Sequence, residues 1–414
     1  MTAVALPAFR GVGIELEYMI VDAATLDVTP LAGDLLRDFA GQPASAFERG
    51  DFGWSNELVQ HVVEVKNLHP SASLDGLAGQ FQTEVRHAAA ALSRHGAKLL
   101  PGGMHPWMDP SRETKLWQLD NAPLYAAFDR IFDCRRHGWA NLQSMHVNLP
   151  FSNEDEFSRL HAAIRTALPL IPALAASSPY ADGAPTAWLD YRLETYRANA
   201  ARCPAISGEV IPEPVRSRAD YDSTILAPMY RQIAPLDPEG MLRHEWLNGR
   251  GAIARFERNA IEIRLADAQE CPRADLAVAH AVIGLVRALY EERWCSFRAQ
   301  CEAPGALLVE VLRDCVRDAE RASIDSACYL GLLGYPRNPA SAQEVWSHVI
   351  ARLAPAGPVA SDAAAVLELI QERGPLARRI LHATANASGR AALAPVYERL
   401  AECLASGTLF TGET

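Results

Sequence analysis

The sequence predicts an α+β fold followed by a helical part, and two observations carry this prediction. From the N-terminus to about residue 270, short β-like runs alternate with amphipathic stretches whose apolar residues recur at helical spacing. After Pro272 the pattern is almost entirely helical and rich in Ala and Leu. Strands mixed with helices, followed by helices alone, are typical of an α+β domain with a helical extension. We therefore expect an α+β domain over residues 1–295 and a helical region over 296–414 that packs on it.

The composition limits which classes of protein this chain can belong to and which partners it can bind. Hydrophobic residues make up 49% and charged residues 21% of the chain, which is ordinary for a globular protein. The formal charge of -11 argues against a nucleic-acid binder, although arginines gathered locally could still bind small anions. The most apolar stretch, 276–290, is too short to span a membrane. No signal peptide is visible and the eight cysteines are scattered without a CxxC pair, so we expect a cytoplasmic protein.

Five segments have the residue pattern of strands, and they lie at residues 11–22, 59–66, 97–101, 143–149 and 253–265. Two longer amphipathic segments, 73–95 and 154–176, are predicted helices. The segment 203–223 is rich in Pro and Arg and predicts a long ordered loop. Because long loops in compact domains are often functional, we expect the region 203–250 to form a lid or the wall of a substrate pocket.

The first predicted strand aims two carboxylates at one place. Apolar side chains at every second position from Ile14 to Ile20 predict a buried face, and Glu15 and Glu17 lie on the opposite face. Two like charges held this close repel each other and lose hydration unless a positive group lies between them. The strand therefore predicts either a cation site or an exposed face with local salt bridges.

Two later predicted strands also carry a polar pair on one face. His146 and Asn148 share a face of the strand at 143–149, and Glu262 and Arg264 share a face within 253–265. Taken alone, such pairs are most simply structural or form cross-strand ion pairs on an exposed face. His105, in a loop beside Trp107, is interpreted as packed on that aromatic ring in preference to binding a substrate.

Glu57 and Glu64 add two further carboxylates. Their spacing of seven would place them on opposite faces of one flat strand, so a helix face or a strand preceded by a bend fits better. Together with Glu15, Glu17, Glu262 and His146, they would need about two hard divalent cations for neutralisation. An oxygen-rich set of this kind favours magnesium or manganese over zinc.

Arginines lie in or beside the same segments, namely Arg192, Arg197, Arg255, Arg258 and Arg264. Guanidinium groups pair with phosphate and carboxylate oxygens through two parallel hydrogen bonds. Carboxylate-bound metal next to arginines is typical of phosphoryl transfer. No single fragment is decisive, and only the whole set indicates a site.

Four pieces of the chain, in this order, resemble the glutamate–cysteine ligase family of the carboxylate–amine ligase type, within the glutamine-synthetase-like superfamily. They are GIELE at 13–17, HVN at 146–148, AASSPYADGAPTAWLDYR at 175–192 and AIEIRLADAQ at 260–269. The most specific part is the SSPYADG loop followed by an arginine and then by an E-I-R-x-x-D strand. Members often carry His-x-His on the second of these strands, whereas here Ser144 and Asn148 flank a lone His146.

The resemblance implies a fold and a set of ligands. The fold would be an antiparallel sheet curved into a funnel, with helices outside and two or three magnesium ions, or manganese, on the inner face. The ion that orients the phosphates of ATP would be held by Glu15, His146 and Glu262. The ion nearer the substrates would be held by Glu17, Glu57 and Glu64. By the same resemblance Arg264 and Arg192 would serve in catalysis, and the candidates for nucleotide binding are Arg197, Arg255, Arg258 and Asn148.

The activity implied by the resemblance is an ATP-dependent ligation of a carboxylate and an amine through an acyl phosphate. The default pair is the γ-carboxylate of glutamate with cysteine or another amine. Two alternatives stay open: an ATP-dependent phosphotransferase acting on a nitrogen acceptor, and a catalytically silent relative that binds a ligand. The Ala-rich helical region could support a homo-oligomer or could cap its own chain.

Overall fold

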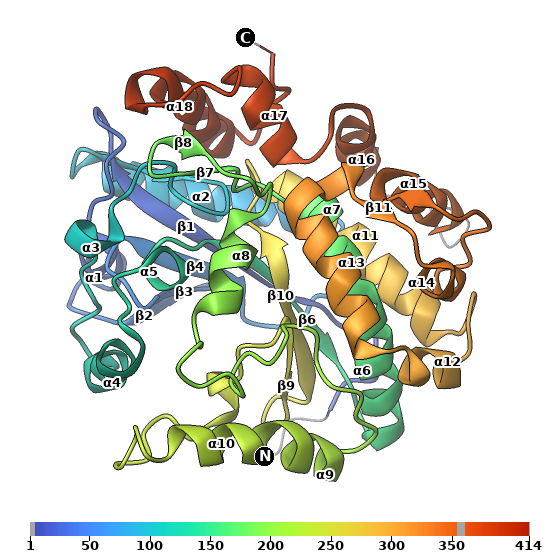
Figure 1. Cartoon of the computed structure of the whole chain (residues 1–414). Coiled ribbons are helices and arrows are strands. Elements are labelled where there is room, and N and C mark those ends of the chain that lie inside the picture. The colour runs from blue at the N-terminus through green and yellow to red at the C-terminus, as the bar shows by residue number, and fades with distance from the viewer. Residues whose placement is uncertain (1–4, 354–360, 414) are drawn as a thin grey trace.

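The computed structural model describes residues 5–353 and 361–413. Its centre is an eight-stranded antiparallel sheet with the order β2-β3-β4-β1-β6-β10-β9, in which β5 also pairs with β1 (Figure 1). The strands, in sheet order, are β2 (Ala46–Arg49), β3 (Phe52–Asn56), β4 (Val62–Asn67), β1 (Gly13–Asp22), β6 (Ser144–Pro150), β10 (Ala260–Asp267) and β9 (Ala252–Arg255), with β5 at Ala97–Leu100. The predicted α+β class is therefore confirmed.

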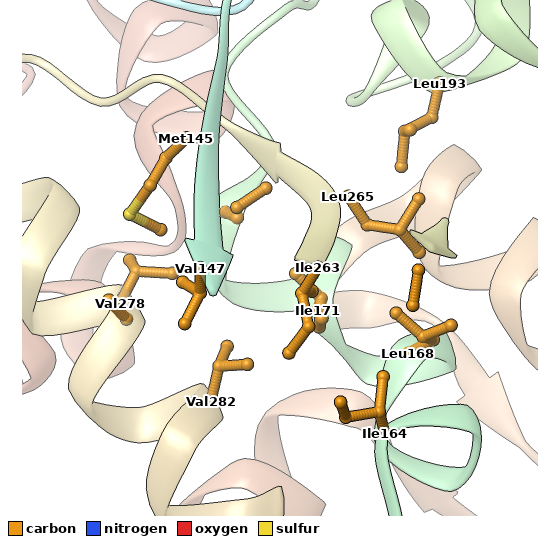
Figure 2. Close-up of a cluster of buried hydrophobic side chains, with 14 of the residues drawn as sticks. Met145, Val147, Ile164, Leu168, Ile171, Leu193, Ile263, Leu265, Val278 and Val282 are labelled. Atoms are coloured by element: carbon orange, nitrogen blue, oxygen red, sulfur yellow. The ribbon is translucent and has the colours of Figure 1, made fainter. Parts of the chain in front are cut away.

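One face of the sheet is apolar and is covered by helices. Alternation along β6 and β10 turns side chains such as Met145, Val147 and Ile263 to this face, where all three are buried. Figure 2 shows them against Ile171 and Val282, from two of the covering helices. The helices concerned are α2 (Leu77–Ser93), α6 (Glu154–Ala167), α7 (Ile171–Ala175) and α11 (Pro272–Tyr290). This packing fixes the register of the strands, so the polar side chains must point to the other face.

The other face carries the polar residues of the predicted site. The elements that border the cavity on this face are α4 (Ala122–Phe132), α5 (His137–Ala140), α8 (Tyr191–Ala198) and the short helix η3 (Glu245–Leu247). The helix α1 (Ala32–Ala40) instead contacts β2, β3 and α2.

The chain after α11 is mainly helical, as predicted. Helix α18 contacts β5 and α2, and in Figure 1 α17 and α18 cross the top of the sheet. Small two-stranded pairs also occur, and one of them, β11 (Ser323–Ile324) with β12 (Ala340–Ser341), lies within this region. The helices are α12 (Phe297–Glu302), α13 (Gly305–Asp318), α14 (Ala327–Leu332), α15 (Ala342–Leu353), α16 (Ser361–Arg373), α17 (Leu376–Ala383) and α18 (Arg390–Ser406). Within the described ranges, no helix combines the length and apolar character that crossing a membrane requires.

Three details of the predicted elements are corrected. The segment 253–265 is not one strand but the hairpin β9–β10, whose turn ends at Asn259 with a positive φ of 49°. The region 203–250 is not a continuous loop, because it is helical from Arg218 to Ile233. Strands β2 and β3 were not predicted, since Gly53, Ser55 and Asn56 interrupt the pattern of strand-forming residues.

Candidate active site

Three neighbouring strand pairs bring the acidic residues together. In the register of β1 with β6, Glu15 lies opposite His146, and in that of β1 with β4, Glu17 lies opposite Glu64. In the register of β10 with β6, Glu262 lies opposite Asn148, two residues from His146 on the same strand. Directly opposed side chains on one face are close neighbours. The sheet itself therefore builds the cluster.

The first group with metal-ligand geometry consists of Glu15, His146 and Glu262, whose ligand atoms all lie within 4.8 Å of one another. The Nδ1 atom of His146 lies 3.2 Å from Glu15 Oε2 and 3.8 Å from Glu262 Oε1. The Nδ2 group of Asn148 donates to Glu15 Oε1 at 3.1 Å. All three members of the group are buried.

The second group consists of Glu17, Glu64 and again His146, with the same 4.8 Å limit. Here the Nε2 atom of the imidazole lies 3.8 Å from Glu17 Oε1. Ser144 holds the other oxygen of Glu17 through its backbone N–H at 2.7 Å and its hydroxyl at 2.9 Å. His146 thus stands between two sets of carboxylates, one on each side of its ring.

The site is short of positive charge. Burial and the charge of Glu15 raise the pKa of Glu64 to about 7, against the opposing charge of Lys66. Burial, with the charges of Glu17 and Glu64, also raises the pKa of Glu57 well above its ordinary value. Burial alone would raise the pKa of Glu15, but its hydrogen bond to His146 lowers it. Carboxylate oxygens and one imidazole nitrogen, crowded in this way, are a donor set that fits divalent cations of the magnesium type.

Three cationic side chains already contact the cluster. The Nζ of Lys66 lies 2.6 Å from Glu64 Oε1. Glu262 lies between two guanidinium groups, with Arg264 Nε at 3.1 Å from one oxygen and Arg255 Nη1 at 3.1 Å from the other. The Arg264 side chain is 27% exposed and lines the cavity described below, so it can reach a bound ligand.

The remaining predicted residues lie in different surroundings. Glu57 follows β3 and lines the same cavity as Glu17, although it belongs to neither group of ligand atoms. Arg197 lies on α8 and pairs with Glu194 at 2.9 Å. Arg258 is exposed in the β9–β10 turn and does not line the cavity. The spacing of Glu57 and Glu64 is explained by the turn between β3 and β4, which separates them.

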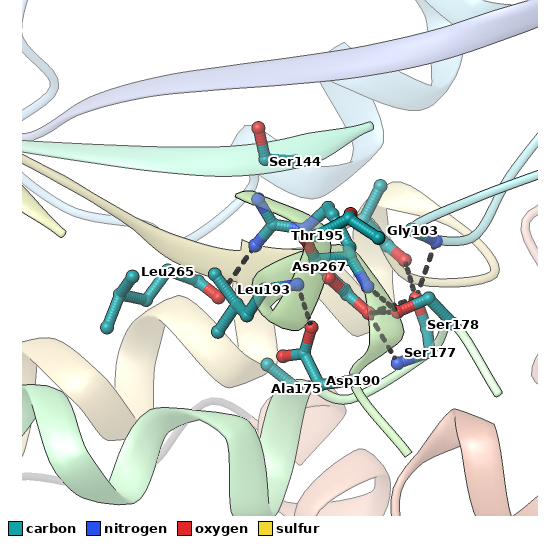
Figure 3. A network of polar contacts seen from close by, with 12 residues as sticks. Gly103, Ser144, Ala175, Ser177, Ser178, Asp190, Leu193, Thr195, Leu265 and Asp267 are labelled. Carbon is teal, nitrogen blue, oxygen red and sulfur yellow. Dashed lines mark hydrogen bonds and ion pairs between the residues drawn. The ribbon is translucent and has the colours of Figure 1, made fainter. Parts of the chain in front are cut away.

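The SSPYADG loop is tied to the E-I-R-x-x-D strand by a buried network (Figure 3). Asp267, fully buried, accepts hydrogen bonds from the backbone N–H of Ser177 and from the hydroxyl of Ser178, both at 2.8 Å, and pairs with Arg192 Nε. A second N–H group of Arg192 donates to the carbonyl of Leu265 at 2.8 Å. Arg192 lines the cavity, but these partners already hold two of its donors.

The same network leaves no room for a side chain at Gly103. Its backbone N–H donates to Ser177 Oγ at 2.7 Å, and a Cβ at this position would lie 2.5 Å from the Asp267 carboxylate. His105, two residues later, is buried in a structural role. Its Nε2–H donates to the carbonyl of Leu26 at 2.7 Å and its ring makes an edge contact with Trp107, as interpreted from the sequence.

A cavity of about 410 Å³ opens onto the second group of carboxylates. Glu17, Glu57, His146 and Arg264 line it where it meets the sheet. Its other walls are largely apolar and aromatic, and they include Leu58, Leu124, Tyr125, Phe128, Trp139, Leu142, Tyr196, Trp246 and Leu247. Trp246 and Leu247 belong to the region 203–250, which the sequence predicted as a lid or a pocket wall. Sequence reasoning missed the aromatic residues of α4, α5 and α8 because they come from separate segments. It also missed Lys66, whose position two residues after Glu64 on one strand face was a usable signal.

The chain is similar to known proteins over most of its length. The model of glutamate-cysteine ligase family 2 (GCS2) matches residues 11–398. An uncharacterized protein of Archaeoglobus fulgidus is 34% identical over 306 residues, which are 74% of this chain and 79% of that protein. A protein of Bradyrhizobium sp. strain ORS 278, provisionally named glutamate--cysteine ligase 2, is 30% identical over 67% of this chain and 60% of its own length.

One solved structure is similar in fold. The bifunctional glutathione synthetase from Pasteurella multocida aligns with 95% of this chain at a TM-score of 0.54 and 13% sequence identity. The chain spans about half of that protein, since the alignment covers 52% of it. The similarity concerns the mixed helix and antiparallel-sheet architecture that carries the carboxylate cluster.

Proposed function

Because the chain belongs to glutamate-cysteine ligase family 2, an enzyme family that forms carbon–nitrogen bonds, we propose that it joins a carboxylate to an amine at the expense of ATP. The observation that supports this most is the pair of ligand groups sharing His146, with Arg264 beside them at one end of a cavity. Metal-bridged phosphates with a nearby guanidinium are the usual equipment for phosphoryl transfer.

The two groups would divide the metal ions between them. Glu15, His146 and Glu262 would hold the ion on the nucleotide side, and Glu17 and Glu64, with Glu57 close by, the ion on the substrate side. Magnesium, or manganese in its place, would neutralise the crowded carboxylates and polarise phosphate oxygens when bound. The two or three ions of the family would thus supply the positive charge that the cluster lacks.

The chemistry would take two steps. An oxygen of the substrate carboxylate attacks the γ-phosphorus of ATP, ADP leaves, and an acyl phosphate forms. The amine nitrogen then attacks the acyl carbon, phosphate leaves, and the nitrogen loses a proton to give the amide. Arg264 would face the charge that develops on the transferred group, and the remaining donors of Arg192 would help to position it. Arg255 and Asn148, which hold Glu262 and Glu15, would keep the nucleotide-side ligands in place.

Water must be kept from an acyl phosphate, because hydrolysis would waste the ATP. The walls contributed by α4, α5, α8 and η3 are suited to this, since they cover the polar face of the sheet. We propose that the sheet serves as the family's funnel, that residues 1–295 carry the whole site, and that residues 296–414 support it. The default substrates are glutamate, through its γ-carboxylate, and cysteine or another amine.

A hydroxamate assay tests the proposal directly. The protein is incubated with Mg-ATP, hydroxylamine and a panel of carboxylic acids that includes glutamate, and both ADP and hydroxamate are measured. We expect both products in equal amounts with at least one acid, and neither without Mg²⁺. ADP without hydroxamate, together with a phosphorylated nitrogen compound identified by its mass, would indicate a phosphotransferase instead. No ADP with any acid would contradict the proposed function.

A further inference from the structure

We propose that one of the two organic substrates carries an aromatic or branched apolar group, and that the aromatic side of the cavity binds it. This inference rests on the proposed function, because it concerns a substrate of the same site. The substrate that carries the group is either the acid or the amine, and the experiment below separates the two.

The aromatic wall is a connected set of rings. On α4, Tyr125, Phe128 and Phe132 recur at spacings of three and four, so they lie on one face of the helix. The ring centroid of Phe128 lies 5.5 Å from that of Trp139 and 5.8 Å from that of Trp246. Three separate segments therefore converge on one place, where Tyr125, Phe128, Trp139 and Trp246 all line the cavity.

Contacts within the chain leave part of each of these rings exposed. Tyr125, Phe128, Trp139 and Trp246 are all half-buried, and the surface that they leave uncovered faces the cavity. Apolar surface left in contact with water is a free-energy cost that an apolar ligand removes. Aromatic walls favour aromatic partners further, through offset or edge-to-face contacts between rings.

Two amide side chains near this wall are occupied, whereas the indole N–H of Trp139 is buried without a partner among the described residues. Asn199 donates to the carbonyl of Gly138, and Asn248 donates to the hydroxyl of Tyr221 at 2.7 Å. The charged lining residues lie on or beside the strands and at Arg192, next to the proposed reacting groups. A substrate that spans the cavity would thus meet charged groups at its reacting end and apolar rings at its other end. A small polar side chain would leave the rings uncovered.

The base of ATP is the other flat group that such a wall could hold. The cavity is lined by Glu17 and Arg264, whereas Glu15, Glu262 and Arg255 do not line it. Under the proposed function, the latter three belong to the nucleotide side. The position of the wall beside Glu17 and Glu57 therefore favours a substrate group over the nucleotide base.

The experiment has an acid arm and an amine arm. In the first, hydroxylamine serves as the amine, and acids with aromatic, branched or small polar side chains are compared by hydroxamate formation with Mg-ATP. In the second, the best acid is combined with aromatic, branched and small polar amines. We expect one arm to show kcat/KM values about 10-fold or more higher for aromatic or branched substrates. The arm that shows the preference identifies which substrate carries the group.

A pair of variants tests the location. In Phe128→Ala, the KM for the preferred apolar substrate should rise about 10-fold or more, and by a larger factor than the KM for ATP or for a small substrate. The control variant is Phe47→Ala, which removes a half-buried phenylalanine of β2 outside the cavity. It should change neither the KM for the apolar substrate nor the KM for ATP. A misfolded variant would instead lose activity toward all substrates in parallel.

Three outcomes would overturn the inference. Equal kcat/KM values for apolar and small polar substrates in both arms would contradict it while leaving the ligase activity established. A rise of KM for ATP alone in Phe128→Ala would assign the wall to the nucleotide base. Absence of ADP and hydroxamate with every acid would contradict the proposed function, and the inference would fall with it.

Discussion

His146 shows how much one residue decides in this molecule. Its two ring nitrogens face different carboxylates, Nδ1 toward Glu15 and Glu262 and Nε2 toward Glu17. A neutral imidazole has one nitrogen free to bind a metal, so His146 can complete either group of carboxylates but not both at once. Ser144 stands where a second histidine could lie, and its hydroxyl contacts both residues. It donates to Glu17 and lies 2.9 Å from His146 Nε2.

Glu17→Gln is expected to abolish turnover without lowering stability. The amide oxygen can still accept the hydrogen bonds of Ser144, whereas the charge that would bind a cation and that repels Glu57 is lost. We expect kcat to fall about 100-fold or more and Tm to stay equal or rise. ADP release and thermal unfolding measure the two effects.

The matched control for this change is Glu48→Gln, an exposed carboxylate of β2 that lines no part of the cavity. Its activity should remain within about twofold of the unmodified protein. In the absence of ATP, added Mg²⁺ should raise the Tm of the control by more than that of Glu17→Gln, which keeps only the group Glu15, His146 and Glu262 intact. Retention of full turnover by Glu17→Gln would contradict the role assigned to this residue.

His105 predicts a loss of stability in mild acid. Burial lowers the pKa of His105 to about 4, and in the neutral ring Nδ1 accepts the backbone N–H of Trp107. An unfolded histidine has a pKa near 6.5, so below about pH 6.5 the unfolded chain binds a proton that the folded chain resists. Stability therefore falls as the pH drops from about 6.5 toward 4, by about 2 kcal/mol between pH 7 and pH 5 from this residue.

Urea unfolding at pH 7 and pH 5 measures this effect. In His105→Gln, whose side chain can still donate to the carbonyl of Leu26 but does not titrate, the difference between the two pH values should shrink by about 2 kcal/mol. A matched change at an exposed histidine, His87→Gln, should leave the difference unaltered. An unchanged difference in His105→Gln would show that the ring is protonated in the folded protein at pH 5.

At the scale of elements, the SSPYADG loop and the end of β10 are held as one unit by Asp267. Replacing this residue by Asn would leave the buried Arg192 without its anionic partner and would turn an amide donor toward groups that themselves donate. Breaking a buried pair on one side costs about 3–5 kcal/mol. We expect Asp267→Asn to lower the free energy of unfolding by that amount.

The control for Asp267→Asn lies in the same loop. Asp182, with a side chain that is 73% exposed, can be changed to Asn at a cost below about 0.5 kcal/mol. Denaturant unfolding followed by circular dichroism gives both values. Similar stabilities for the two variants would mean that the loop is held mainly by other contacts.

Strand alternation made much of the site predictable from the sequence. The pleat places Glu15 and Glu17 on one face whatever the rest of the chain does, and the structure brings His146 and Glu262 to the same face. The β9–β10 hairpin was not predicted, because neither Gly nor Pro marks its turn. The polar run Glu257, Arg258 and Asn259 between the two apolar stretches was the usable signal. The meeting of the rings in one aromatic wall could not be predicted from the sequence, because they come together only after distant segments have packed.

At the scale of the whole molecule, the helical C-terminal region shares its core with the sheet. One apolar cluster extends from Val12 on the N-terminal side to Leu404 in α18, and a second joins Met19 of β1 to Leu400 of the same helix. Gln82 of α2 donates to the carbonyl of Leu404 at 2.8 Å. We therefore expect the two regions to unfold together, since neither could keep its apolar surface buried alone.

The ion pair between Arg379 and Glu270 tests this coupling. Arg379, on α17, places Nη1 at 2.6 Å from the Glu270 carboxylate and also donates to the carbonyl of Phe410, and both charged side chains are at most 1% exposed. Arg379→Met should leave a buried carboxylate unpaired and cost about 3–5 kcal/mol. Arg373→Met, at a pair with Glu413 in which the arginine side chain is 41% exposed, should cost less than about 1 kcal/mol.

Because the apolar clusters join both regions, circular dichroism and tryptophan fluorescence should report one transition in Arg379→Met, shifted to lower urea as a whole. Two separate transitions in Arg379→Met, with only the first shifted, would instead mean that residues 296–414 unfold independently of the sheet and that the site can persist without them.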